Sequence, residues 1–108
     1  MTIKWVMVDP LVMNGEPFCY GSRLTVRQLL ELRREGHDVV DLLKDQPELR
    51  LLGIAEAYAF AARNHDRYAE FFEPDGSLAG PGFSDAELAA LPEGLRLPGV
   101  TIRVEAPA

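Results

Sequence analysis

Arginine supplies the clearest candidate chemistry in this sequence. Arg23, Arg27, Arg33 and Arg34 fall within twelve positions, and Arg50 follows further along the chain. A guanidinium group presents N–H donors in a fixed fork that matches phosphate oxygens and the acceptor edge of guanine. Arg23, Arg27, Arg34 and Arg50 are therefore candidate DNA contacts, and Arg50 is the one placed to donate two hydrogen bonds to a guanine.

Each of these arginines also has an ordinary structural interpretation. Glu31 and Glu35 alternate with the arginines of the same segment, which is typical of a solvated helix face. Arg23 either pins an N-terminal hairpin to a carboxylate of the core or reaches a DNA phosphate. The net charge of −6, from 17 acidic and 11 basic residues, argues against coating of nucleic acid by bulk electrostatics. DNA binding would need a dimer that doubles the few positive contacts, or a basic partner.

Residues that could form a catalytic or metal site do not gather. His37 and His65 are far apart, and Cys19 has no base beside it. His65-Asp66 lacks the second histidine that a helical metal pair requires. We therefore expect neither an enzyme nor a metal or cofactor site. A single cysteine and the lack of an apolar run of about 20 residues favour a cytoplasmic protein.

Large apolar side chains gather in the last part of the chain, together with two arginines. The residues are Tyr68, Phe71, Phe72, Phe83, Arg96 and Arg103. Such a segment could wrap over a partner protein and form its binding surface. The alternative, which is commoner for a chain this small, is that the aromatic residues complete the protein's own core.

Helical periodicity and capping signals cover most of the chain. Thr25 with Gln28 predicts a helix over 25–35 that ends at Gly36. Asp38 caps a second, short helix that runs toward Pro47. Residues 49–72 predict one long helix, apolar on several sides and so buried against more than one neighbour. Ser84 with Glu87 predicts a last short helix through Leu91.

The two ends of the chain carry strand-like patterns. Residues 3–8 and 100–104 are rich in β-branched or aromatic types, and we expect them to pair in one small sheet. Asn14-Gly15 favours a tight turn, so residues 11–13 are expected to fold back on residues 16–20.

The stretch GEPFCYGSRLTV carries a pattern that extends into the helices. The residues at its defining offsets are Gly15, Pro17, Gly21, Ser22, Arg23, Leu24, Thr25 and Val26. A helix ending at Gly36 and a short helix ending at Pro47-Glu48-Leu49 follow. The whole resembles domain-of-unknown-function family 433, small bacterial antitoxins of the VapB type, over about residues 6–64. Members typically read GG-x-P-x-x-x-GTR-x-x-V, then helix, Gly, helix, a Pro-x-Leu turn and a third helix.

The motif glycines and proline also have local structural roles. Gly15 permits the hairpin turn, Pro17 guards a strand edge, and Gly21 lets the backbone leave the strand. Two departures from the family pattern are mild, with Asn14 in place of the first glycine and Ser22 in place of threonine. The third departure is Arg50, which stands where members usually place Ser or Thr, so the third helix should lack its N-cap.

The resemblance implies a mainly α fold with a three-helix helix-turn-helix core, homeodomain-like or winged-helix-like. A small β element would come from the N-terminal and C-terminal segments. Residues 1–72 would form the helix-turn-helix domain with its hairpin. Residues 73–108 would form an extension of loop, short helix and strand that packs on the same domain or on a partner.

In function, the resemblance implies the antitoxin of a type II toxin–antitoxin system. It would be a homodimer that neutralises a nuclease-like, PIN-type toxin and regulates its operon by binding DNA. Arg96 or Arg103 would reach the toxin's metal-binding carboxylates. The candidate recognition segment 48–56 is poor in base-reading groups, because Glu48 and Glu56 have the wrong sign for phosphates. The alternative is a protein-interaction module or dimeric scaffold that does not bind DNA.

Overall fold

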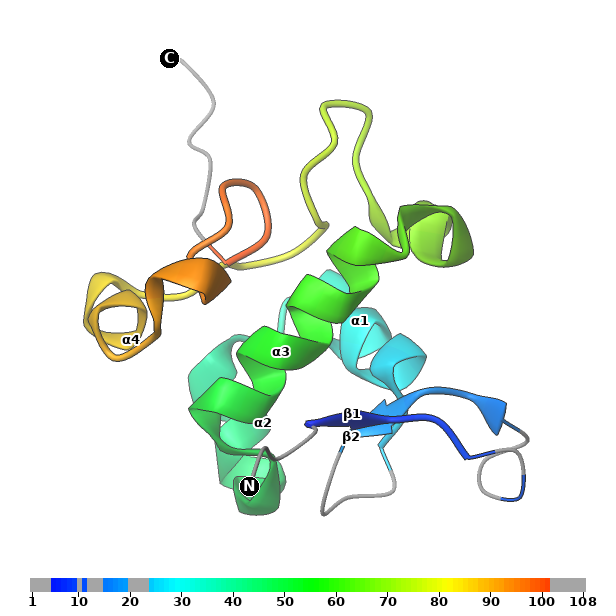
Figure 1. The fold of residues 1–108 in the computed structure, drawn as a ribbon. Coiled ribbons are helices and arrows are strands. Elements are labelled where there is room, and N and C mark those ends of the chain that lie inside the picture. Colours follow the sequence, from blue (N-terminus) through cyan, green and yellow to red (C-terminus); the bar gives the residue numbers. More distant parts are fainter. Residues whose placement is uncertain (1–4, 10, 12–14, 20–23, 102–108) are drawn as a thin grey trace.

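Helix α3 (Arg50–Arg63) runs through the middle of the molecule, and the other elements pack around it (Figure 1). The computed structural model describes residues 5–9, 11, 15–19 and 24–101. Helices α1 (Val26–Arg34) and α2 (Val39–Asp45) lie against α3, as does the antiparallel pair β1 (Val6–Met7) and β2 (Phe18–Cys19). The chain is therefore mainly helical with a small β element, as the sequence predicts.

Shorter elements connect and complete this core. The 3-10 helix η2 (Pro47–Leu49) leads into α3, and the 3-10 helix η3 (His65–Phe71) follows it. Helix α4 (Asp85–Ala89) and the 3-10 helix η4 (Glu93–Leu95) belong to the last part of the chain. No helix of the described residues is long and apolar enough to cross a membrane.

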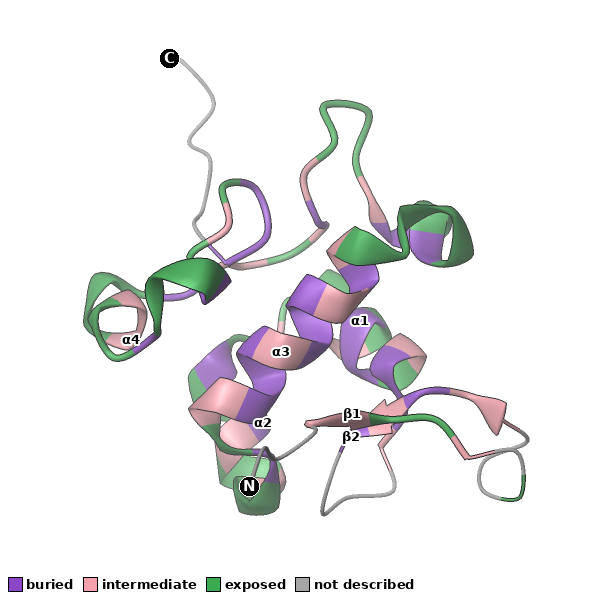
Figure 2. Ribbon diagram, viewed as in Figure 1, coloured by how far each residue is buried: buried purple, intermediate pink, exposed green. Residues whose placement is uncertain are grey.

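Small side chains let α3 be packed from several sides. Its buried residues are Gly53, Ile54, Ala55, Ala57, Tyr58, Ala59 and Ala61. At Gly53 a Cβ atom would lie 3.1 Å from the ring of Trp5, so the absence of a side chain lets this indole approach the helix. The burial confirms the expectation of more than one neighbour, and Figure 2 shows it along the helix.

The predicted start signals of α1 and α2 are confirmed. The Thr25 hydroxyl accepts a hydrogen bond from the Gln28 amide at 3.0 Å, and the Gln28 side chain accepts one from the Thr25 amide at 2.9 Å. Gly36 follows α1 with a φ of 104°, and the Asp38 carboxylate caps α2 through the Asp41 amide at 2.9 Å. The capping residues therefore determine where both helices begin.

The single long helix predicted over 49–72 is wrong beyond Arg63. Asn64 leaves the helical region with φ −118° and ψ 46°, and its side-chain amide donates to the Phe60 carbonyl at 2.8 Å. Asparagine competes with helix continuation through such local bonds. The chain resumes as η3, which contacts α1 and buries Tyr68 and Phe71.

The strand pairing also differs from the predicted hairpin. Val6 pairs with Cys19 and Met7 with Phe18, whereas Leu11, predicted to fold back on residues 16–20, lies in a turn and is 94% exposed. The pair Asn14-Gly15 favours a turn, but it does not determine which residues before the turn pair with β2. Gly15 has the positive φ expected of a turn, at 78°. Asn14 and Gly21 lie outside the described residues.

Pro17 is not the edge guard that the sequence predicts. It is buried, and its carbonyl accepts a hydrogen bond from the Val26 amide at 2.9 Å. Phe18 bridges to Thr25 on the same side of β2. The chain segment that enters α1 therefore runs along one edge of β2, and β1 pairs with the other edge as the outer strand of the sheet.

The C-terminal part packs on the helical core. Ser84 and Glu87 form the predicted capping box of α4, which ends at Ala89 rather than Leu91. The Phe83 ring packs edge-on against Tyr58 of α3, with 5.9 Å between centroids.

The strand predicted at 100–104 is wrong at its two described residues. Val100 and Thr101 lie in a turn, where the Thr101 hydroxyl donates to the Leu95 carbonyl at 2.6 Å and accepts from the Leu97 amide at 2.7 Å. Residues 102–104 lie outside the described part. Within the described residues, the paired strands are β1 and β2, both near the N-terminus.

Substitution of Arg50 tests whether the backbone is strained at the start of α3. It has φ 58° and ψ 157°, and α3 has no side-chain cap, as the departure from the family pattern predicts. Relief of a strained non-glycine conformation outweighs the entropy cost of glycine, so Arg50→Gly should raise the free energy of unfolding by about 1 kcal/mol. Urea denaturation measures it, with Arg50→Ala as a control that keeps the strain. A lower free energy of unfolding in Arg50→Gly would contradict the assignment of backbone strain to Arg50.

Candidate functional site

Arg27, a predicted DNA contact, is engaged within the protein. Its guanidinium forms an ion pair with Glu70 and donates to the Arg67 carbonyl at 3.0 Å. The same group lies over the rings of Tyr68 and Phe71, at 5.3 and 5.5 Å from their centroids. These contacts join α1 to η3, so Arg27 has a structural role that its solvated-face interpretation did not include.

Of the other predicted DNA contacts, Arg34 lies over the same Phe71 ring as Arg27. Arg34 is exposed and lies over Phe71, 4.7 Å from the ring centroid, while Arg50 is exposed at the start of α3. Arg23 lies outside the described residues. Arg27 and Arg34 therefore lie close together, but Arg27 is already paired with Glu70 within the protein.

The candidate recognition segment 48–56 is covered over much of its length. Gly53, Ile54 and Ala55 are buried, and only Arg50 and Arg63 among the residues of α3 are exposed. A recognition helix needs one face open to the major groove. Leu52, Glu56 and Phe60 follow one another at four-residue spacing and are half-buried, so the one face of α3 that they form is only partly open.

Most of the aromatic residues predicted to bind a partner lie in the protein's own core. Tyr68, Phe71 and Phe83 are all buried, whereas Phe72 is half-buried beside His65, with 4.3 Å between ring centroids. Arg96 is exposed, and its Nε donates to the Leu91 carbonyl at 3.1 Å. Arg103 lies outside the described residues.

Arg33 is the functional candidate that sequence reasoning missed. It was assigned to the solvated face of α1, but it is only 2% exposed. Its Nε donates to the Ala79 carbonyl at 3.2 Å, and its Nη2 to the Leu78 carbonyl at 3.4 Å. The guanidinium lies over the Tyr58 ring at 4.6 Å, and the buried Nη1 has no hydrogen-bond partner.

The electrostatic state of Arg33 follows from this burial. Desolvation lowers the pKa of its guanidinium, and the neighbouring Tyr58 acts in the opposite direction. The sequence did contain a signal for this position. Arg33 follows Val26, Leu29 and Leu30 by seven, four and three residues, so it continues the buried stripe of α1.

Arg33 lines a pocket of about 150 Å³. Loop residues of the C-terminal part complete it: Glu73, Ser77, Leu78, Ala79, Gly80, Gly82 and Gly99. The pocket thus lies where α1 meets the segment that the sequence predicts as a Gly/Pro-rich loop.

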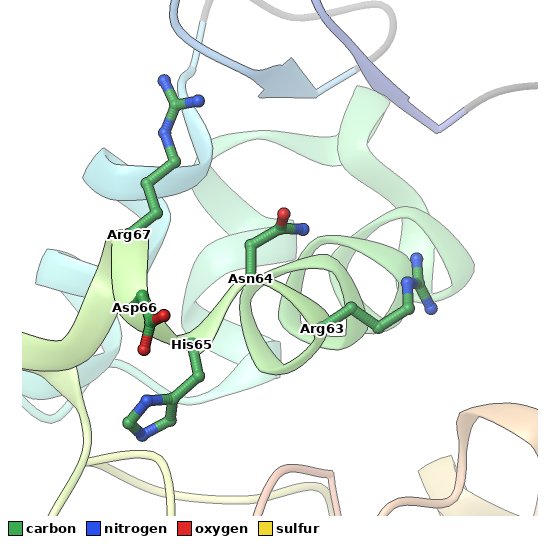
Figure 3. Close-up of a pocket in the computed structure, with 5 residues that line it drawn as sticks. All are labelled: Arg63, Asn64, His65, Asp66 and Arg67. Carbon is green, nitrogen blue, oxygen red and sulfur yellow. The ribbon is translucent and has the colours of Figure 1, made fainter.

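A larger hollow of about 390 Å³ lies where α3 meets η3. Its lining residues Arg63, Asn64, His65, Asp66 and Arg67 are all exposed. Figure 3 shows Asn64 and Arg67 extending to one side and His65 to the other. Their polar groups do not converge on one point, and the described residues contain no cluster of three metal-ligating side chains.

Comparison with known families identifies the first half of the chain. The family described as "Protein of unknown function (DUF433)" matches residues 6–61. The chain belongs to this family. No curated protein and no solved structure matches it. The family match spans β1, β2, α1, α2, η2 and most of α3, so it includes Arg33 but not the loop residues opposite it in the pocket.

The contacts of Arg27 predict an unequal effect of two neighbouring arginines on stability. Arg27→Ala removes an ion pair, a hydrogen bond and two ring contacts, and should lower the free energy of unfolding by about 1–2 kcal/mol. Arg34→Ala removes one exposed ring contact and should cost less than about 1 kcal/mol. Urea denaturation of both variants measures the difference, and equal losses would refute the fastening role of Arg27.

Proposed function

We propose that the chain is a protein-binding module of the cytoplasm that acts as an antitoxin and holds a nuclease-like toxin at the outer edge of β1. The observation that supports this is an exposed apolar edge. Met7, Val8 and Leu11 are 37%, 58% and 94% exposed. Among the described residues, β1 pairs with β2 alone.

An outer strand can bind a partner by accepting a further strand. Its free main-chain groups supply affinity, and its side chains supply specificity. Met7 and Val8 would give such an added strand apolar contacts beside the main-chain bonds.

The charge of the chain fits the proposed partner. A nuclease needs positive surface to attract the phosphates of its substrate. A chain of net charge −6 complements such a surface and speeds encounter with it. The antitoxin role itself is carried by the family resemblance, and the charge and the β1 edge agree with it.

The single cysteine is compatible with the reducing cytoplasm. Cys19 is 1% exposed, and burial raises the pKa of its thiol to about 12. The thiol therefore stays protonated and shielded at physiological pH.

Val8→Lys tests the proposed edge, because Val8 directly follows β1 and a lysine beside an outer strand opposes strand addition. Tagged wild-type and variant chains are recovered from the native cell at moderate salt, and partners are identified by mass spectrometry. We expect a nuclease-like protein in equal amount with the wild type and a loss of at least about tenfold with Val8→Lys. Val40→Lys is the matched control, since Val40 on α2 is 65% exposed and should retain the partner.

The outcomes separate the candidate functions. Recovery of the wild type alone, as a dimer that Val8→Lys converts to a monomer, would identify a scaffold instead of an antitoxin. Partner recovery unchanged by Val8→Lys would exclude the β1 edge as the binding surface.

A second candidate function is regulation of the operon by DNA binding. Arg34 and Arg50 favour it, because both are exposed and neither forms an ion pair with a described residue. The exposed acidic residues Asp38, Asp41 and Asp45 on and beside α2 oppose it through their negative field.

A mobility shift of operator DNA decides this second candidate. Arg34→Ala with Arg50→Ala should weaken binding on all sequences, and wild-type affinity should fall steeply between 50 and about 200 mM salt. Glu31→Gln is a control on the same exposed side of α1 that should not weaken binding. Absence of a shift at 50 mM salt would reject the regulatory function.

A further inference from the structure

We propose that Arg33 forms a binding site for a small oxyanion, a phosphate or carboxylate group, in the pocket between α1 and residues 73–82. The site is independent of the β1 edge and of the antitoxin role. It rests on two observations: Arg33 lines the pocket, and the buried Nη1 of its guanidinium has no hydrogen-bond partner.

The partners of Arg33 leave its charge uncompensated. Nε and Nη2 donate to the carbonyls of Ala79 and Leu78, which are neutral acceptors. No described carboxylate forms an ion pair with Arg33. A buried charge is costly unless it is paired with an opposite charge. An anion held in the pocket that Arg33 lines would supply that opposite charge.

The pocket is built around Arg33 by a close backbone approach. Gly80 has φ 102°, and a Cβ atom there would lie 2.1 Å from the Arg33 carbonyl oxygen. Only glycine allows the loop to lie this close to the end of α1. Among the described residues, no main-chain hydrogen bond uses the amides of Gly80 or Gly82. Both glycines line the pocket, where their N–H groups are further candidate donors to an anion.

The size and lining of the pocket limit what it accepts. A volume of about 150 Å³ has room for a small oxyanion such as phosphate or acetate. The Ser77 hydroxyl is already committed, because it donates to the Asp75 carboxylate at 2.6 Å.

Among the described residues that line the pocket, Glu73 is the one carboxylate, and it is exposed. Its charge repels an incoming anion, so it lowers affinity and gives the proposal a second test. If Glu73 were itself the counter-ion of Arg33 in solution, its removal would destabilise the protein. If the site takes an external anion, removal of Glu73 would strengthen binding.

The experiment titrates the full chain with sodium phosphate and, separately, with sodium acetate, at constant ionic strength made up with chloride. Two-dimensional NMR follows the amides of Gly80 and Gly82, and thermal unfolding is recorded in parallel. We expect saturable shifts of these amides and a saturable rise in Tm with at least one of the two anions. Comparison of the two titrations shows whether the site prefers a phosphate or a carboxylate group.

Variants connect the response to Arg33. Arg33→Met should weaken anion binding at least tenfold, since a charge-assisted hydrogen bond is lost. Arg33→Lys keeps the charge and serves where the Met variant does not fold; it should weaken binding about threefold through loss of the guanidinium fork. Glu73→Gln should strengthen binding about threefold. Val8→Lys should bind anions as the wild type does, which separates this site from the β1 edge.

Three results would overturn the site. The first is the absence of saturable shifts at Gly80 and Gly82 with both anions. The second is an equal response in the wild type and the folded Arg33 variant. The third is loss of stability in Glu73→Gln with anion binding only in that variant, since Glu73 would then be the natural counter-ion.

Discussion

The burial of the Arg33 side chain at the end of α1 ties together three parts of the chain. Its guanidinium lies on Tyr58 of α3 and bonds to the carbonyls of Leu78 and Ala79. Its backbone is met by Gly80 at a distance that excludes any side chain. The Leu78 amide then donates to the Gly99 carbonyl at 2.8 Å, which carries the attachment on to the end of the described chain. The C-terminal part is thus positioned by a residue of the family-matched half.

Two arginines of α1 show how the surroundings set the role of one residue type. Arg27 is 31% exposed and has a carboxylate partner in Glu70, so its charge remains hydrated and its pairing contributes modestly to stability. Arg33 is 2% exposed, donates to two carbonyls and lies beside Tyr58, whose polar interaction with the guanidinium raises the Arg33 pKa against the larger effect of burial. The same group there carries a desolvation cost that an external anion would offset. One position fastens η3, and the other is suited to bind a ligand.

The parts of this fold that follow local rules could be predicted from the sequence. The capping residues Thr25, Asp38 and Ser84 begin three helices because each hydroxyl or carboxylate reaches an amide three residues ahead. The parts that depend on distant contacts could not. The break at Asn64 brings Tyr68 and Phe71 against α1, and the ladder of β1 forms with β2 across a long connection. Asn64 favours the break through its local bond to Phe60, but the packing of Tyr68 and Phe71 on α1 and the pairing of β1 with β2 depend on residues distant in the sequence.

The candidate site likewise combines a feature that local sequence patterns indicate with contacts that they do not. The sequence points to arginine as the residue type of interest, and the spacing along α1 places Arg33 on its buried stripe, but neither shows that the C-terminal loop covers this side chain. The family match ends at residue 61, before that loop begins. The outer strand β1 therefore belongs to the part shared with the family, whereas the pocket at Arg33 also needs residues 73–82 and Gly99. A partner bound at β1 would use the part of the chain shared with the family, whereas an anion bound at Arg33 would also need the segment beyond the match.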